Sequence, residues 1–277
     1  MNRLALASLF TLFFAMPSGA EEPTRVATLL PFVEEALVLD PEHVEVVATV
    51  RSDLHVPVED GMIDLGSPHS PSFERLAAAR PQYVIGDRMI HAMLAERLAS
   101  SGAEVVFLDT TGVDATFEGI LEVGKKTGAE QVLQAAVSSA KEKIDALKIE
   151  RPVRVLILFG APGTFYAVSE RTWVGDLAAR MGYENVAPKG SSRYPGFVPL
   201  NDEVLATLRP DLVLLIAHGD PAAIQADFNQ RASQGGPWAS LADAPLGVHA
   251  LDPHTFSANP GLDMPSAGAQ LMEFSSR

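Results

Sequence analysis

The fold is decided by two stretches that can be laid over each other, Glu74-Arg-Leu-Ala-Ala-Ala-Arg80-Pro81-Gln-Tyr-Val84 and Glu203-Val-Leu-Ala-Thr-Leu-Arg209-Pro210-Asp-Leu-Val213. Six of the eleven aligned positions are identical, without a gap. Each copy has the pattern of a helix, a proline that ends it and a short buried strand. One copy in each half predicts two lobes of similar α/β architecture. Chance similarity is the alternative, since this pattern is common in α/β proteins.

The alternation of strands and helices continues outward from both copies, which predicts parallel sheets covered by helices. The expected strands lie at residues 25–30, 44–50, 83–85, 104–108, 153–159, 212–216 and 248–251. The expected helices lie at residues 71–80, 89–100, 117–125, 173–181, 202–208 and 222–232.

A stretch of different character separates the two halves. Residues 130–149 contain neither Gly nor Pro, and apolar residues recur there at helical spacing. This predicts one helix of about 20 residues, roughly 30 Å long. The predicted organisation is therefore a signal peptide at 1–20, an N-terminal lobe at 21–128, a linker helix at 129–150 and a C-terminal lobe at 151–277. A ligand cleft is expected between the lobes, because ligands in such sheets bind beyond the carboxyl ends of strands.

Composition excludes several classes of function. The 277 residues include 35 Asp and Glu against 21 Lys and Arg, a formal charge of −14, and no cysteine. The negative charge argues against nucleic acid as a partner, because phosphate binding needs a basic face. Without cysteine there are no disulfides, no thiolate metal sites and no cysteine-linked lipid anchor.

The first twenty residues have the pattern of a secretory signal peptide. Arg3 is followed by an apolar run from Leu4 to Met16 and by the small residues Ser18-Gly19-Ala20. A membrane anchor is the alternative, but a run of about 13 residues is short of the roughly 20 that span a bilayer. We expect a monomeric protein that is soluble in a periplasm and is not lipid-anchored.

Two histidines occupy positions where a ligand is expected. His69 lies in the constrained loop Gly66-Ser-Pro-His-Ser-Pro71, and His218 lies in Ile216-Ala-His-Gly-Asp-Pro221, directly after an apolar strand. One histidine from each lobe could bind one metal from opposite sides, and imidazole is a common axial ligand of haem iron. The alternative is two solvated loop histidines.

Several motifs resemble those of ABC-transporter substrate-binding proteins for siderophores, cobalamin and haem. They are Gly66-Ser-Pro-His-Ser-Pro-Ser-Phe-Glu74, Val153-Arg-Val-Leu-Ile-Leu-Phe-Gly-Ala-Pro-Gly-Thr-Phe165 and Ala217-His-Gly-Asp-Pro221. The similarity is greatest to the haem-binding lipoproteins of the iron-regulated surface determinant system. The resemblance implies a class III periplasmic binding protein, with two Rossmann-like lobes joined by one long rigid helix. It also implies a carrier without enzymatic activity that delivers its ligand to an inner-membrane ABC permease and its ATPase.

The resemblance also assigns roles to four residues. His218 occupies the position of an axial histidine, and His69 occupies that of an axial methionine. A bis-histidine haem would favour ferric iron, because Met/His ligation raises the reduction potential. Glu74 and Glu203 match glutamates that dock onto permease arginines, although ordinary solvated acids are the alternative.

Further candidates lie in expected second-lobe loops, where basic and phenolic groups could meet haem propionates or the anionic groups of a siderophore. They are Tyr166, Arg171, Arg193 and Tyr194. Met89 stands eight residues after Pro81, as His218 stands eight after Pro210. It is an alternative axial ligand, and simple packing is the other interpretation, which the sequence favours.

The leading hypothesis is a haem carrier, with haem as transported ligand and not as a catalytic cofactor. The same scaffold binding a ferric siderophore or a corrinoid is the first alternative. A histidine-based metalloenzyme is the distant alternative, since a hydrolytic zinc site usually has three protein ligands and the sequence offers no third one at a suggestive spacing.

Overall fold

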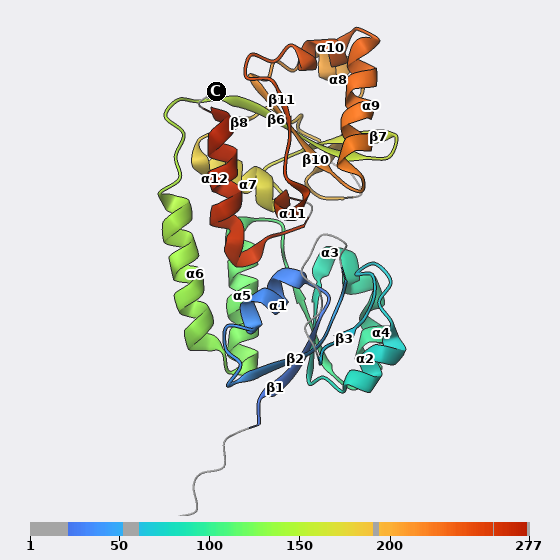
Figure 1. Cartoon of the computed structure of the whole chain (residues 1–277), viewed down its shortest axis with the longest axis vertical. Coiled ribbons are helices and arrows are strands. Elements are labelled where there is room, and N and C mark those ends of the chain that lie inside the picture. Colours follow the sequence, from blue (N-terminus) through green and yellow to red (C-terminus); the bar gives the residue numbers. More distant parts are fainter. Residues whose placement is uncertain (1–21, 52–60, 191–193, 257, 276–277) are drawn as a thin grey trace, which may run out of the picture.

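The computed structural model describes residues 22–51, 61–190, 194–256 and 258–275. The predicted signal peptide lies outside these residues. Figure 1 shows two α/β lobes placed one above the other along the long axis, with helices α5 (Val113–Thr127) and α6 (Glu130–Asp145) along one side. In the described ranges no helix is both long enough and apolar enough to cross a membrane.

The first lobe contains a five-stranded sheet of order β3-β2-β1-β4-β5. Every strand pair in it is parallel, as predicted from the alternation of strands and helices. The strands are β1 (Thr24–Thr28), β2 (Val44–Thr49), β3 (Ile63–Asp64), β4 (Tyr83–Asp87) and β5 (Glu104–Leu108). Its helices, besides α5, are α1 (Pro31–Leu37), α2 (Phe73–Ala79), α3 (Arg88–His91), the 3-10 turn η1 (Ala92–Leu94) and α4 (Ala95–Ala99).

One helix prediction in this lobe is wrong. Residues 89–100 were expected to form a single helix, but the chain forms α3, η1 and α4 in succession. The first break falls at His91, whose side chain turns inward and makes hydrogen bonds to the backbone of Asp87 and Pro68. Tertiary contacts of one side chain therefore override a helical pattern.

The second lobe contains a mixed sheet of order β11-β10-β6-β7-β9, with β8 paired to β6. Strands β11, β10, β6 and β8 are parallel, whereas β7 and β9 are antiparallel additions. The strands are β6 (Arg154–Ala161), β7 (Thr164–Val168), β8 (Glu184–Asn185), β9 (Phe197–Pro199), β10 (Leu212–Ala217) and β11 (Val248–Ala250). The helices are α7 (Trp173–Met181), α8 (Asp202–Thr207), α9 (Pro221–Ser233), α10 (Pro237–Ala242), α11 (Pro253–Phe256), the 3-10 turn η2 (Gly261–Asp263) and α12 (Met264–Ser275).

The repeated segment forms a helix, a proline break and a buried strand in both lobes. Helix α2 begins after Ser72, whose hydroxyl accepts the Arg75 N–H at 3.3 Å, and α8 begins after Asn201, whose side-chain oxygen accepts the Val204 N–H at 2.8 Å. These are ordinary N-caps. The strands that follow, β4 and β10, each lie inside their sheet with a strand on either side.

The linker helix is shorter than predicted. Helix α6 ends at Asp145, four residues before the predicted end at 149, and the Ile149 N–H then bonds to the carbonyl of Met181 at the end of α7. Near the C-terminus η2 contacts α1, α5 and α6, and α12 contacts α6 and α7. The end of the chain thus packs against the linker and both lobes, and the lobe limits given above stay predictions.

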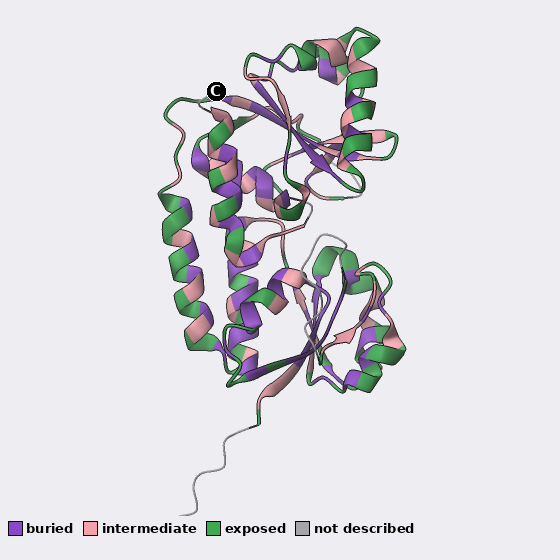
Figure 2. Cartoon of the chain, in the orientation of Figure 1, coloured by how far each residue is buried: buried purple, intermediate pink, exposed green. Residues whose placement is uncertain are grey.

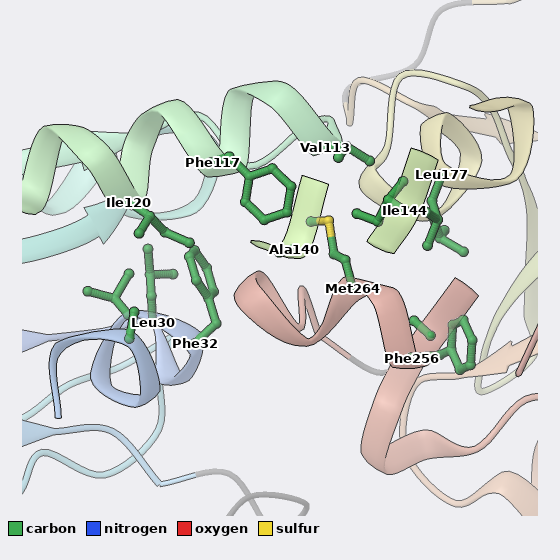
Figure 3. Close-up of a cluster of buried hydrophobic side chains, with 14 of the residues drawn as sticks. Leu30, Phe32, Val113, Phe117, Ile120, Ala140, Ile144, Leu177, Phe256 and Met264 are labelled. Carbon is green, nitrogen blue, oxygen red and sulfur yellow. The ribbon is translucent and has the colours of Figure 1, made fainter. Parts of the chain in front are cut away.

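A continuous cluster of buried apolar side chains joins the lobes on this helical side. Figure 3 shows Phe32 of the first lobe, Phe117 of α5, Ile144 of α6 and Leu177 of α7 around the completely buried Met264. In Figure 2, α5 is buried along much of its length and α6 exposes its outer face. Because protein interiors are close-packed, this joint resists changes in the angle between the lobes.

Polar contacts reinforce the same joint. Helix α5 begins after Gly112, which has no side chain to cap it, and Asp176 of α7 accepts the Val113 N–H at 2.8 Å instead. Arg180 of α7 bonds both to Asp176 at 3.0 Å and to Asp114 at 2.6 Å. The hydrogen bond from Arg180 is the main cause that lowers the pKa of Asp114 below its usual range.

Candidate ligand-binding cleft

A cleft with a cavity volume of about 140 Å³, open to solvent, lies between the two lobes, as the sequence predicts. Its walls are formed by Met89, Thr110, Thr111, Phe159, Val168, Arg171, Thr172, Trp173, Val174, Pro195, Phe197, Ile216, Phe256 and Asn259. The first three come from the first lobe, and the rest from the second. Thr110 follows β5, while Phe159 and Ile216 lie near the ends of β6 and β10, so the cleft is at the carboxyl ends of strands.

Aromatic rings form much of the second-lobe wall. Trp173 stacks on Phe256 with centroids 5.9 Å apart, and Phe159 meets Phe197 edge to face at 5.1 Å. Both geometries are favourable for aromatic pairs. These rings were not predicted from the sequence, although the rule that ligands bind at strand ends indicates Phe159 and Thr110.

Asn259 ties the wall of the cleft to the other lobe. Its amide nitrogen donates to the Thr116 hydroxyl at 2.8 Å, and its side-chain oxygen accepts the Gly261 N–H at 2.9 Å. This asparagine fixes the segment before η2 against the first turns of α5.

Among the described residues that line the cleft, Arg171 is the charged one. It lies in the loop before α7, as predicted, and its side chain is exposed. Tyr194 is 52% exposed and precedes Pro195 of the cleft wall, but is not itself part of the wall. Arg193 lies outside the described residues.

The placement of Tyr166 in a loop is wrong. This residue lies on β7, where it pairs with Phe159 of β6 and Pro199 of β9. The turn Pro162-Gly163, with Gly163 at a φ of +77°, joins β6 and β7 into a hairpin that the sequence analysis missed. Because directly paired residues share one face of a sheet, Tyr166 lies on the side of Phe159.

His218 lies directly after β10 with an exposed side chain. Its backbone N–H donates to the carbonyl of Gly160 at 2.8 Å, which continues the β10–β6 ladder by one residue. Its ring is 5.5 Å from the ring of Phe159, a residue of the cleft wall. His218 therefore lies at the edge of the cleft, and the hydrogen bonds of the sheet hold its backbone in place.

His69 is also exposed and lies in the loop between β3 and α2, outside the cleft wall. Its N–H donates to the Ser67 hydroxyl at 3.3 Å. Met89 lines the cleft and is 41% exposed, so the structure places a thioether where the first lobe faces the ligand space.

The first lobe also contains a buried polar pair that the sequence analysis missed. His91 is 1% exposed and Asp87 is 3% exposed. Burial lowers the pKa of His91 below its usual value, an effect that the Pro68 hydrogen bond and the Asp87 charge oppose. The bond between Thr110 and Asp87, at 2.6 Å, connects this pair to the cleft wall.

Glu74 and Glu203 are both exposed, each in the first turn of its helix, α2 and α8. They occupy corresponding places in the two lobes.

Among the described residues, no group of three or more His, Cys, Asp or Glu is arranged to hold a metal ion.

Two α/β lobes joined by packed helices, with a cleft between them at the carboxyl ends of the strands, define the class of two-lobed solute-binding proteins. The chain belongs to the periplasmic binding protein family, whose sequence profile matches residues 26–235. Members of this family are the substrate-binding components of ABC importers, and the chain is thus a transport protein and not an enzyme.

Individual relatives agree with this assignment. The high-affinity heme uptake system protein IsdE of Staphylococcus aureus is 25% identical over 217 residues, which are 76% of this chain and 73% of IsdE. An ABC transporter substrate-binding protein from Listeria monocytogenes has a TM-score of 0.79 at 26% identity, covering 92% of this chain and 98% of the other.

The structure of IsdE complexed with heme also has a TM-score of 0.79, at 22% identity, covering 92% of this chain and 99% of IsdE. The triscatecholate siderophore binding protein FeuA of Bacillus subtilis has a TM-score of 0.69 at 17% identity, covering 92% and 94%. Proteins of one fold therefore bind haem or ferric siderophores, so the similarity in fold does not determine which of these ligands this chain binds.

Proposed function

We propose that this protein binds haem in the cleft between its lobes and delivers it to the permease of an ABC importer. The single observation that carries the proposal is the chemistry of the cleft wall. Of the fourteen described residues that line it, nine are apolar or aromatic and Arg171 is the one with a charge. A flat apolar macrocycle with two carboxylates fits such a wall, whereas a polar, multiply anionic siderophore would need several cations.

The proposed iron ligands are His218 and His69, one from each lobe. His218 is held by the strand ladder at the edge of the cleft, and His69 is exposed on the first-lobe loop. Met89 is the alternative ligand from the first lobe, because it is part of the cleft wall. Neutral imidazole and thioether are both known axial ligands of haem iron.

The proposed partners of the haem carboxylates are Arg171, Tyr194 and Tyr166, together with Arg193, which lies outside the described residues. Arg171 is the strongest of these because a guanidinium binds a carboxylate with two parallel hydrogen bonds. Its exposed side chain can follow the ligand without loss of a buried contact.

The proposed route begins with secretion through a cleavable signal peptide at 1–20 and release into the periplasm without a lipid anchor. Glu74 and Glu203 would then meet basic residues of an inner-membrane permease, which works with its ATPase. Support comes from their exposed, corresponding positions in two similar lobes.

The experiment uses the intrinsic fluorescence of Trp173, which lines the cleft. The chain has two tryptophans, and the variant Trp238→Phe leaves Trp173 as the single reporter. This variant is titrated with hemin, with a ferric triscatecholate and with cobalamin. We expect saturable quenching at the lowest concentration with hemin. Tighter binding of the siderophore or of the corrinoid would overturn the assignment of haem and leave the family assignment intact.

A further inference from the structure

A buried imidazole stands directly behind the loop that carries His69. The Nδ1 atom of His91 accepts the Asp87 N–H at 2.8 Å, and its Nε2 atom lies 3.0 Å from the carbonyl oxygen of Pro68. A backbone N–H can only donate and a carbonyl can only accept. The ring is therefore neutral, with its proton on Nε2.

The bond to Pro68 fixes the tip of the loop. Within the tip, the His69 N–H bonds to the Ser67 hydroxyl and the Ser70 N–H bonds to the Ser67 carbonyl. Among the described residues, the bond from His91 is the one hydrogen bond that joins residues 67–70 to another element. The position of His69 thus depends on its neighbour Pro68 and, through that carbonyl, on His91.

The surroundings of His91 are shaped to hold the ring in this orientation. A Cβ atom at Gly86 would lie 3.2 Å from the Cβ of His91 and 3.3 Å from its Nδ1, tighter than usual contact. The carboxylate of Asp87 accepts the Met89 and Ile90 N–H groups with one oxygen and the Thr110 hydroxyl with the other. One buried pair therefore holds both the His69 loop and the Thr110 side of the cleft.

We infer that His91 is a positioning residue for ligand capture, holding the loop 66–71 so that His69 can face the iron of a bound haem. The inference rests on the proposed function. It assigns to His91 no contact with the ligand, since the residue acts through Pro68.

Two substitutions distinguish the hydrogen bond from His91 to Pro68, called the tether below, from the packing of the His91 ring. In His91→Gln the side-chain amide nitrogen reaches about as far as Nε2 and can still donate to Pro68. In His91→Asn the amide oxygen takes the place of Nδ1 and can still accept the Asp87 N–H, but the donor to Pro68 is lost. Both variants lose the ring, and His43→Asn serves as the control because His43 is paired with Asp40 away from the cleft.

The first measurement needs no ligand. Hydrogen exchange of the Ser70 and Ser72 amides is followed in the apo proteins, since both amides bond within or next to the loop. We expect faster exchange in His91→Asn and unchanged exchange in His91→Gln. Equal protection in wild type and His91→Asn would overturn the tether.

The second measurement uses hemin. Loss of a residue that positions a metal ligand without touching the metal typically lowers metal affinity by about 10–100-fold. We therefore expect about tenfold weaker binding in His91→Asn, with a spectrum shifted toward that of His69→Ala. His91→Gln and His43→Asn should match the wild type. An equal loss in both His91 variants, or an unchanged spectrum in His91→Asn, would contradict the inference. If the wild type fails to bind hemin, the proposed function fails, and the exchange measurement still decides the tether.

Discussion

The corresponding strands β4 and β10 each lie inside their sheet, next to an edge strand, and they end differently. Strand β4 ends at Asp87, which is itself the N-cap of α3 and accepts the Met89 N–H at 2.7 Å. Strand β10 ends at Ala217, and His218 and Gly219 intervene before Asp220, the N-cap of α9. Gly219 has a φ of +104°, which favours glycine and turns the chain between His218 and the helix.

This difference shows how two similar lobes can supply a ligand by different means. The second lobe has an exposed histidine at the strand end itself, on a backbone that the sheet holds. The first lobe has no such position after β4, and its exposed histidine comes from the neighbouring loop, which the buried His91 holds from behind. We therefore expect the second lobe to be the stronger anchor for iron.

The largest expected effect tests that asymmetry. His218→Ala should weaken hemin binding by about 100-fold and His69→Ala by about tenfold, since even residues that only position a metal ligand typically contribute about 10–100-fold to metal affinity. Titration by absorbance measures both. His43→Ala is the control, because His43 is paired with Asp40 outside the cleft. A larger loss in His69→Ala than in His218→Ala would reverse the comparison.

The second-largest expected effect on hemin affinity comes from the charge of Arg171. A hydrogen bond to a charged group contributes about 1.5–3 kcal/mol, so Arg171→Gln should bind hemin about tenfold more weakly. Hemin dimethyl ester, which has no free carboxylate, should bind to the variant and to the wild type alike. A similar loss with both compounds would show that Arg171 acts through packing or fold and not through the carboxylates.

The joint between the lobes resists changes in their relative position, and Asp176 is the residue whose substitution tests the joint. Asp176→Ala should lower the free energy of unfolding by about 1 kcal/mol, because the Val113 N–H loses its capping acceptor. Asp176→Asn retains an acceptor and should lose less. Urea unfolding measures the difference, and equal stability of the alanine variant and the wild type would exclude a capping role.

The smallest effect is a pH dependence of the apo protein that comes from His91. Burial lowers the pKa of His91 in the folded state, while Asp87 opposes the shift and His69 adds to it. The unfolded chain then binds more protons below about pH 6.5, so the stability contribution present at neutral pH is lost as the pH falls below that value. His91→Gln should flatten this part of the curve. An identical pH dependence in variant and wild type would contradict the assignment of the neutral ring.

Much of the fold follows from local sequence patterns. Strand β5 and helix α7 match the predicted residues 104–108 and 173–181, because apolar runs and caps mark their ends clearly. The repeat also predicted that a proline break and a buried strand follow each helix, as β4 follows α2 and β10 follows α8. The return of η2 and α12 to the linker was not predicted, since it depends on tertiary burial of Met264 and not on a local signal.

The site was predicted less completely for a similar reason. The loop positions of His69, Arg171 and His218 follow from breaks in the pattern, and Arg171 does line the cleft. The role of His91 was missed because its partner Pro68 lies 23 residues away in the sequence. Tyr166 was misplaced because the short Pro162-Gly163 turn between two apolar runs forms a hairpin and not a longer loop.

The most direct test of the central claim is the electron paramagnetic resonance spectrum of the protein with one equivalent of ferric hemin. Two strong axial ligands, one from each lobe, predict a low-spin ferric signal in the wild type that becomes high-spin in His218→Ala and in His69→Ala. A high-spin wild-type complex, or a low-spin signal that neither substitution changes, would contradict ligation by His218 and His69 across the cleft.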